Sequence, residues 1–234
     1  AGSFDSRNQK IARASATLYQ KAGVKFAILG SEEKCTGDLA RRSGNEMLFQ
    51  MLAGENVETM NNYKIKKIVT ACPHCLNSIK NEYPQLGGEY EVFHHSQFIA
   101  KLVDEGRLPV KSNLKDTITY HDPCYLGRYN REYEAPRNLL KHAADEPMRE
   151  MKRHGSESFC CGGGGARMWM EETIGTRINE NRTEEAISTG ASTVATGCPF
   201  CMTMLSDGIT AKAKSESMQV KDVAELVLEA VEAV

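Results

Sequence analysis

The chain repeats a set of cysteines at a fixed offset, and this repeat restricts its fold more than any other feature. Adding 126 to each position carries Cys35, Cys72 and Cys75 onto Cys161, Cys198 and Cys201. The neighbouring residues keep the same offset, which carries Gly37, Ala40, Arg41, Thr70 and Pro73 onto Gly163, Ala166, Arg167, Thr196 and Pro199. Such a repeat indicates a duplicated structural unit. We therefore expect two units, residues 1–108 and residues 109–234.

Two positions break the symmetry between the units. Lys34 stands where the second unit has Cys160, and the counterpart of Cys124 would fall at position −2, because 124 − 126 is −2. A strand is expected just before Cys124, and the first unit has no matching segment. We therefore expect the first unit to be degenerate and to lack its opening strand. The chain begins with Ala1 rather than Met, so we expect it to be part of a longer protein.

Short apolar runs alternate with helix-type patterns along the chain. Strands are predicted at residues 25–29, 65–70, 91–93, 117–121, 148–151, 193–196 and 218–220. Helices are predicted at residues 6–22, 38–63, 73–83, 97–104, 135–144, 168–187, 199–212 and 222–234. Strands that alternate with helices imply parallel sheets with crossover connections. The predicted fold class is α/β, with two pseudo-repeated parallel-sheet units and flanking helices.

The overall composition excludes several classes of protein. The net charge of −2 gives no general attraction to nucleic acid. No apolar run approaches the roughly 20 residues needed to span a bilayer, and the N-terminus lacks the zones of a signal peptide. Eight cysteines in 234 residues are too sparse for a disulfide scaffold. We expect no nucleic-acid partner, no membrane span within this chain and a reducing, cytoplasmic location.

Five cysteines of the second unit form the strongest pattern of a metal site. The lone Cys124 is followed by the adjacent pair Cys160 and Cys161, and then by the C-x-x-C motif of Cys198 and Cys201. Five thiolates exceed the four ligands of a structural zinc ion, and they match the soft ligands of iron-sulfur clusters. We expect an iron-sulfur cluster at this site. Zinc held by four of these cysteines, with Cys160 spare, is the alternative.

Four glycines, at residues 162–165, directly follow the cysteine pair. The loop lacks the Lys-Ser/Thr ending of a P-loop and the G-x-G-x-x-G pattern. We expect Gly162, Gly163 and Gly164 to bring backbone N–H groups close to the sulfur atoms of the cluster. A plain flexible loop is the alternative. Trp169 follows, and it is expected either over the cluster or in the core.

His121 is a candidate catalytic residue. It lies three positions before Cys124, so its imidazole could transfer protons at a substrate site beside the cluster. A structural hydrogen bond is the alternative role for this side chain.

The first unit offers a smaller set of metal ligands. Cys35, Cys72 and Cys75 could hold a second cluster or a zinc ion, with His94 or His95 as a fourth ligand. The C-x-x-C motif of each unit is predicted to start a helix, where free N–H groups and the helix dipole stabilise thiolates.

These motifs together resemble the duplicated cysteine-rich CCG domain, and the resemblance covers nearly the whole chain. It rests on Cys124, Cys160-Cys161-Gly162 and Cys198-Pro199-Phe200-Cys201, with the degenerate copy Cys35-Thr36-Gly37 and Cys72-Pro73-His74-Cys75. This family includes the B subunit of heterodisulfide reductase and the iron-sulfur subunits of glycolate, lactate and anaerobic glycerol-3-phosphate oxidation systems. The segments KCTGDLARRSGNEMLFQMLAGENVETMN, FCCGGGGARMWMEE and CPFCMTMLSDG are most similar to the C-terminal part of bacterial membrane iron-sulfur reductases.

Those reductases accept electrons from electron-transferring flavoprotein and pass them to menaquinone. The resemblance therefore implies an iron-sulfur electron-transfer oxidoreductase module. Its electron donor would be electron-transferring flavoprotein or another flavoprotein, and quinone would be reached through additional domains. The resemblance also implies a place at the inner face of the membrane, within a larger membrane protein.

In heterodisulfide reductase, a unit with five cysteines carries a non-cubane 4Fe-4S cluster. The resemblance implies that Cys124, Cys160, Cys161, Cys198 and Cys201 bind such a cluster. The first unit departs from the pattern, so its cysteines would hold a simpler cluster, a zinc ion or nothing. Two other functions stay open. They are a heterodisulfide-type thiol-disulfide reductase and a zinc-stabilised, non-enzymatic scaffold.

Overall fold

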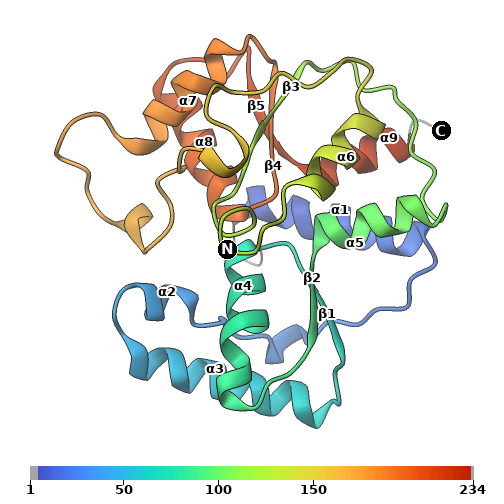
Figure 1. Ribbon diagram of the computed structural model, residues 1–234, viewed down its shortest axis with the longest axis vertical. Coiled ribbons are helices and arrows are strands. Elements are labelled where there is room, and N and C mark those ends of the chain that lie inside the picture. Colours follow the sequence, from blue (N-terminus) through green and yellow to red (C-terminus); the bar gives the residue numbers. More distant parts are fainter. Residues whose placement is uncertain (1–4, 233–234) are drawn as a thin grey trace.

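The computed structural model describes residues 5–232 and contains two parallel sheets. The first sheet pairs β1 (Lys67–Thr70) with β2 (Glu91–His94). The second sheet has the order β3 (Ile118–His121), β4 (Thr193–Thr196) and β5 (Gln219–Asp222). Figure 1 shows the second sheet above the first, with helices around both. The predicted α/β class with two parallel-sheet units is confirmed.

The strands of the two sheets correspond to each other through the sequence repeat. Adding 126 to the bounds of β1 gives the bounds of β4, and adding 128 to the bounds of β2 gives those of β5. β3 has no counterpart among the described residues before β1. The first unit therefore lacks an opening strand in the part of the chain that the structure describes, as the sequence predicts.

Helices flank both sheets, and several begin at residues suited to a helix N-terminus. The Asp5 side chain accepts a hydrogen bond from the Arg7 backbone N–H at 2.9 Å, and Asn45 does the same for Leu48 at 3.0 Å. The helices are α1 (Ser6–Lys21), α2 (Asp38–Arg42), α3 (Glu46–Asn62), α4 (Pro73–Asn77), α5 (His95–Asp104), α6 (Glu134–Ala143), α7 (Ile178–Ser188), α8 (Pro199–Ala211) and α9 (Val223–Glu232). A π-helical turn (Ser78–Glu82) and a 3-10 turn (Tyr83–Leu86) extend α4.

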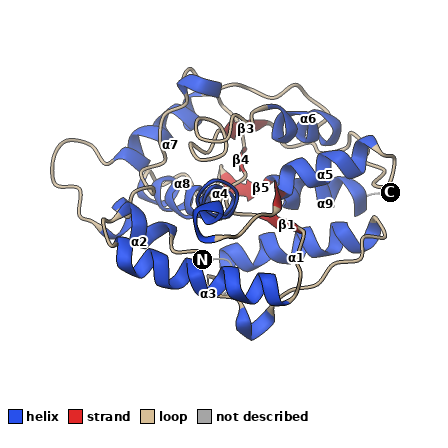
Figure 2. Cartoon of the chain, turned by 60° about the horizontal axis from the view of Figure 1, so that its bottom comes forward, coloured by secondary structure: helices blue, strands red, loops and turns tan. Residues whose placement is uncertain are grey.

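The largest hydrophobic core joins the two halves of the sequence. Helix α1 packs against α9, and α5 packs against α6, as Figure 2 shows for the group of α1, α5 and α9. The shared core contains Leu18, Ile99, Leu102, Ile118, Leu139, Leu140, Leu226 and Val227. The division into residues 1–108 and 109–234 stays a prediction. Within residues 5–232, no helix has the length and apolarity required to cross a membrane.

Two of the predicted strands are wrong. Residues 25–29 form no strand, and Phe26 and Ile28 are 43% and 79% exposed. An apolar run becomes a strand only beside a partner strand, and β1 pairs with β2 rather than with this segment. Residues 148–151 also form no strand. The Arg149 N–H donates to the Ile118 carbonyl at 2.8 Å, which ties this segment to the start of β3.

Two of the predicted helices are shorter than expected. The helix predicted at 38–63 is divided into α2 and α3, because Gly44 adopts a left-handed φ of +91° between them. The helical region predicted at 168–187 is reduced to α7. A 3-10 turn (Arg167–Trp169) and a loop that contains Gly175 at φ +70° precede it.

Candidate metal centre

The cysteines of the second unit lie beyond the carboxyl ends of two neighbouring strands. Cys124 follows β3, and Cys198 follows β4 as the residue that precedes α8. Because the carboxyl ends of parallel strands meet at the same edge of a sheet, these two loops come together. The loop that carries Cys160 and Cys161 joins them at this edge.

Five thiols of the second unit converge on one place. The sulfur atoms of Cys161 and Cys201 lie 3.3 Å apart. Cys160 hydrogen-bonds with both Cys124 and Cys161, and Cys198 hydrogen-bonds with Cys201. All eight cysteines of the chain are unbridged. The structure thus brings together the five residues that the sequence singles out, while their role as ligands stays a prediction.

The thiols differ in how easily they lose a proton. Hydrogen bonds from the Cys124 and Cys161 thiols lower the pKa of Cys160 to about 2, and the Gly162 N–H, 3.3 Å from the Cys160 sulfur, adds to this effect. Burial opposes ionisation of Cys198. Hydrogen bonds from neighbouring thiols and from the N–H groups at the start of α8 nevertheless lower the pKa of Cys198. Hydrogen bonds with neighbouring thiols raise the pKa of Cys124, Cys161 and Cys201 instead. Cys160 and Cys198 are therefore the thiols that ionise most readily to the thiolate, which is the form that binds metals.

The cysteines of the first unit adjoin those of the second. Cys72 hydrogen-bonds with Cys198 across the two units, and Cys75 hydrogen-bonds with Cys72. The Thr36 hydroxyl lies 3.5 Å from the Cys75 sulfur and places the Cys35 loop beside it. Cys35 itself is exposed. The predicted ligands of the first unit are therefore neighbours of the second set rather than a distant site.

The glycine-rich loop approaches its surroundings closely at two of the three predicted positions. Gly162 has a φ of +89°, and a Cβ atom there would lie 3.2 Å from Ile178. A Cβ atom on Gly163 would lie 3.1 Å from Met204 and 3.6 Å from the Cys161 sulfur. Gly164 is more open, because the nearest atom to its added Cβ would be 3.9 Å away, on His74. Close packing thus restricts residues 162 and 163, while the predicted approach of the glycine N–H groups to a cluster stays a prediction.

Trp169 lies on the surface near the C-x-x-C motif of the second unit. Its side chain is 61% exposed, and its ring meets the Phe200 ring edge-on at 6.2 Å. Phe200 lies between Cys198 and Cys201 in sequence. The alternative that Trp169 belongs to the core is therefore wrong, and its proposed role beside a cofactor stays a prediction.

His121 lies at the end of β3, buried against the converging thiols. One of its ring nitrogens and the sulfur atoms of Cys161 and Cys201 all lie within 4.8 Å of one another. The Arg182 Nε donates to His121 Nδ1 at 3.0 Å, and both side chains are fully buried. Burial, together with the positive charge of Arg182, lowers the pKa of His121 to about 3. The ring is therefore neutral, so it is a poor general acid, but its one N–H group can still donate a hydrogen bond.

The carboxylate of Asp122, next to His121, connects several structural elements through hydrogen bonds. Asp122 accepts two hydrogen bonds from Arg137, at 2.6 and 2.9 Å, and one from the Gly155 N–H at 2.8 Å. These contacts attach the β3 end to α6 and to the loop that leads to Cys160. Neither Arg137 nor Arg182 was found by sequence reasoning. The helical spacing of Arg182 relative to Asn179, Thr183 and Ala186 could have indicated its burial, because all four residues lie on the buried side of α7.

The histidine pair of the first unit is engaged in other contacts. His94 Nε2 lies 2.9 Å from the Gly197 carbonyl, and His94 Nδ1 lies 2.7 Å from the Ser96 hydroxyl. His95 Nε2 lies 2.6 Å from the Asp222 carboxylate. These contacts tie β2 to β4 and β5 across the two sheets. These contacts give both side chains a structural role, and metal ligation by His94 or His95 stays an untested possibility.

Comparison with known proteins finds a matching family model and several relatives. The family model of the cysteine-rich CCG domain matches residues 3–80 and 118–206. The chain is 49% identical over 230 residues to a protein named "Probable iron-sulfur-binding oxidoreductase FadF" from Bacillus subtilis, with 98% of this chain and 33% of that protein aligned. It is 46% identical over 239 residues to the "EtfAB:quinone oxidoreductase" of Syntrophomonas wolfei, with 99% of this chain and 33% of that protein aligned.

A third relative comes from the archaea. The chain is 37% identical over 227 residues to one of the subunits of the dihydromethanophenazine:CoB--CoM heterodisulfide reductase of Methanosarcina barkeri, with 94% of this chain and 55% of that protein aligned. The chain thus spans about a third of the length of the first two relatives and about half of the third. The matched residues include all eight cysteines. This chain belongs to the family of proteins with the cysteine-rich CCG domain.

Proposed function

We propose that this chain is the iron-sulfur electron-transfer module of a larger oxidoreductase, and that it passes electrons from a flavoprotein toward a quinone. The convergence of five thiols in the second unit carries the proposal. The names of two relatives, an iron-sulfur-binding oxidoreductase and an EtfAB:quinone oxidoreductase, support it. Electron-transferring flavoprotein is the proposed donor. Quinone would be reached through other domains, and a cytoplasmic location is part of the same proposal.

The donor set fits an iron-sulfur cluster. Cys124, Cys160, Cys161, Cys198 and Cys201 would hold it, and five sulfur donors match a non-cubane 4Fe-4S cluster better than a four-ligand zinc ion. The bound cluster would supply one-electron redox chemistry. The chain would hold it through thiolates and through the Gly162 N–H, which already points at the Cys160 sulfur at 3.3 Å. Gly163 and Trp169 would line its surroundings, with Gly164 at the open side of the loop.

The burial of the five cysteines is graded, which suits electron transfer. Cys161, Cys198 and Cys201 are buried, whereas Cys124 and Cys160 are partly exposed. A cluster held there would be shielded from water on one side and would approach the surface on the other. A redox partner could therefore exchange electrons at the side of Cys124 and Cys160. In the first unit, Cys35, Cys72 and Cys75 would hold a second cluster or a zinc ion.

A heterodisulfide-type thiol-disulfide reductase is the second candidate function. The partial exposure of Cys124 and Cys160 would let a small disulfide approach the cluster, and one relative belongs to a heterodisulfide reductase. Turnover of a small disulfide by cluster-loaded protein, with electrons from a chemical reductant, would favour it. Electron transfer without disulfide turnover favours the first function.

Metal analysis of the anaerobically purified chain tests the proposal. We expect iron and labile sulfide, visible absorption, and an EPR signal that changes with redox state. Cys160→Ser should lower the iron content sharply. Cys35→Ser, a matched cysteine substitution outside the five, should retain the iron of the second unit. Zinc at both sites, without iron or sulfide, would overturn the proposal and favour a zinc-stabilised scaffold.

A further inference from the structure

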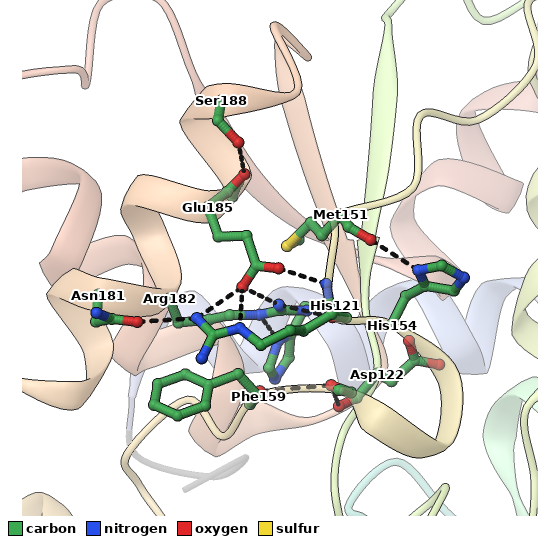
Figure 3. A network of polar contacts seen from close by, with 12 residues as sticks. His121, Asp122, Met151, His154, Phe159, Asn181, Arg182, Glu185 and Ser188 are labelled. Atoms are coloured by element: carbon green, nitrogen blue, oxygen red, sulfur yellow. Dashed lines mark hydrogen bonds and ion pairs between the residues drawn. The ribbon is translucent and has the colours of Figure 1, made fainter.

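A buried network of charged side chains lies behind the converging thiols of the second unit. Its centre is Arg182, whose side chain is fully buried in α7. Arg182 Nη1 donates to the Arg153 carbonyl at 2.9 Å and to the Glu185 carboxylate at 2.8 Å. Figure 3 shows Arg182 between Glu185 on one side and His121 on the other. The network is therefore anchored on a helix and directed at the thiols.

The contact between Arg182 and His121 determines which ring nitrogen carries the proton. A guanidinium nitrogen donates hydrogen bonds and never accepts them. Because Arg182 Nε lies 3.0 Å from His121 Nδ1, that ring nitrogen must present its lone pair. The proton of the neutral ring must then reside on Nε2. Arg182 thus selects one tautomer of His121.

The Nε2 atom of His121 is buried and has no hydrogen-bond partner among the described residues. A buried N–H group without an acceptor is costly, so such a group indicates a missing partner. A ring nitrogen of His121 lies within 4.8 Å of the Cys161 and Cys201 sulfur atoms. The missing acceptor therefore belongs at the site of the proposed cluster.

We infer that Arg182 is a positioning residue that holds His121 as an N–H donor to the sulfur atoms of the cluster, and that it thereby prevents His121 from binding iron. The inference rests on the proposed cluster. A histidine binds a metal through a nitrogen lone pair. Here Arg182 occupies the lone pair of Nδ1, and the proton occupies Nε2. His121 would raise the reduction potential, because an N–H group directed at sulfur stabilises the added negative charge of the reduced cluster.

The network also extends to the loop of the cysteine pair. The Arg153 guanidinium lies 3.9 Å from the centre of the Phe159 ring, and Phe159 precedes Cys160. Arg153 in turn donates from Nε to Glu185 at 3.0 Å and from Nη2 to Asn181 at 2.9 Å. Glu185 therefore links Arg182, which contacts His121, to Arg153, which contacts the residue before Cys160.

The first test uses the metal-free full chain with ¹⁵N-labelled histidine. NMR shifts of the ring nitrogens distinguish the two tautomers, and His121→Gln identifies the signals of His121. We expect the Nε2–H tautomer in the wild type and a mixture of tautomers in Arg182→Met. An Nδ1–H tautomer or a doubly protonated ring at neutral pH in the wild type would overturn the inference. This result is independent of whether a cluster binds.

The second test uses the cluster-loaded chain. His121→Phe removes the N–H donor, and His121→Gln is the matched variant that keeps one. We expect His121→Phe to retain the iron and to lower the ratio of reduced to oxidised cluster about tenfold at a fixed potential, a negative shift of about 59 mV for a one-electron couple. His121→Gln should shift less. Loss of iron in His121→Phe, or a potential equal to that of the wild type, would contradict the role as a donor.

Pulsed EPR of the wild type separates a donor from a ligand. A donor predicts a weakly coupled ¹⁴N and a proton coupling that disappears in D₂O. A strongly coupled ¹⁴N, as in direct iron coordination, would overturn the inference while leaving the proposed function intact. If Arg182→Met does not fold, as judged by circular dichroism, the His121 variants and the wild-type spectra still decide the question. Wild-type protein without any cluster would instead contradict the proposed function.

Discussion

Cys72 of the first unit and Cys198 of the second unit contact each other through their thiols. The two residues are separated by the repeat offset of 126, and each follows the equivalent strand, β1 or β4. The C-x-x-C motifs of the two units therefore face each other. A metal bound by either unit would lie beside a cysteine of the other, so the two sites are expected to influence each other.

Substitution of Cys72 should weaken the second-unit site without removing it. Cys72 would support the ligand Cys198 from outside the cluster, and loss of such a partner typically lowers metal affinity by about 10- to 100-fold. Cys198→Ser removes a proposed ligand and should abolish iron binding at that site. Iron retention against a chelator measures both effects. Equal and complete loss in the two variants would show that Cys72 is itself a ligand of the same cluster.

Gly162→Ala should destabilise the chain, whereas Gly164→Ala should leave its stability near that of the wild type. An alanine at 162 would have to adopt a φ of +89° with its Cβ 3.2 Å from Ile178. Such backbone strain costs about 1–3 kcal/mol. At Gly164 the nearest atom to an added Cβ is 3.9 Å away. Urea unfolding of the metal-free protein measures the difference, and equal stabilities would refute the close packing of this loop.

Arg137→Gln should lower the free energy of unfolding by about 3–5 kcal/mol, because it leaves the buried Asp122 carboxylate without its cation. The Asp122 side chain is 3% exposed, and Arg137 binds it at 2.6 Å. Lys67→Gln is the matched control. It breaks an exposed ion pair with Glu91, for which about 0–1 kcal/mol is expected. Chemical denaturation of both variants checks the prediction, which fails if the two losses are similar.

The stability of the Glu225→Gln variant relative to the wild type should increase as the pH rises. Burial raises the pKa of Glu225 above its ordinary value of 4.5 in the folded chain. The folded state therefore binds more protons than the unfolded state, and the wild type loses stability as the pH rises from about 4.5 through the folded pKa. In the wild type, the Glu225 carboxylate accepts a hydrogen bond from the Asp222 N–H at 2.9 Å. Glutamine does not titrate, and its side-chain oxygen can accept the same hydrogen bond.

Melting temperatures of the wild type and Glu225→Gln across pH 4 to 8 provide the measurement. The difference between them should grow in favour of the variant above pH 4.5 and then level off. A difference that is constant with pH, or one that grows in favour of the wild type, would show that the pKa of Glu225 is not raised by folding.

Much of the fold can be predicted from the sequence, because the patterns that indicate helices, strands and the repeat are local or periodic. The repeat predicts two related sheets, and the apolar run at 193–196 predicts β4 with the bounds that it has. The run at 25–29 is as apolar, yet it forms no strand. What differs is the presence of a partner strand, and pairing depends on segments far away in the chain. Patterns within one segment do not contain that information.

The candidate site, like the fold, can be predicted from the sequence only in part. Cysteine spacing and the carboxyl ends of parallel strands are sufficient to predict that the five second-unit thiols converge. The contact between Cys72 and Cys198 depends on how the two units dock, which a repeat does not specify. The contact between Arg182 and His121 joins residues 61 positions apart. An arginine is ordinarily exposed, so its burial follows only from the partners Glu185 and His121 that the fold supplies.

Native mass spectrometry of the anaerobically purified chain tests the central claim most directly, because it measures the mass of the metal centre bound to the chain. The account predicts added mass equal to a 4Fe-4S cluster on the wild type, and its loss in a Cys160→Ser, Cys161→Ser double variant that remains folded. A wild-type chain that carries only zinc, or a double variant that keeps the full cluster mass, would contradict the claim that these thiols bind one iron-sulfur centre.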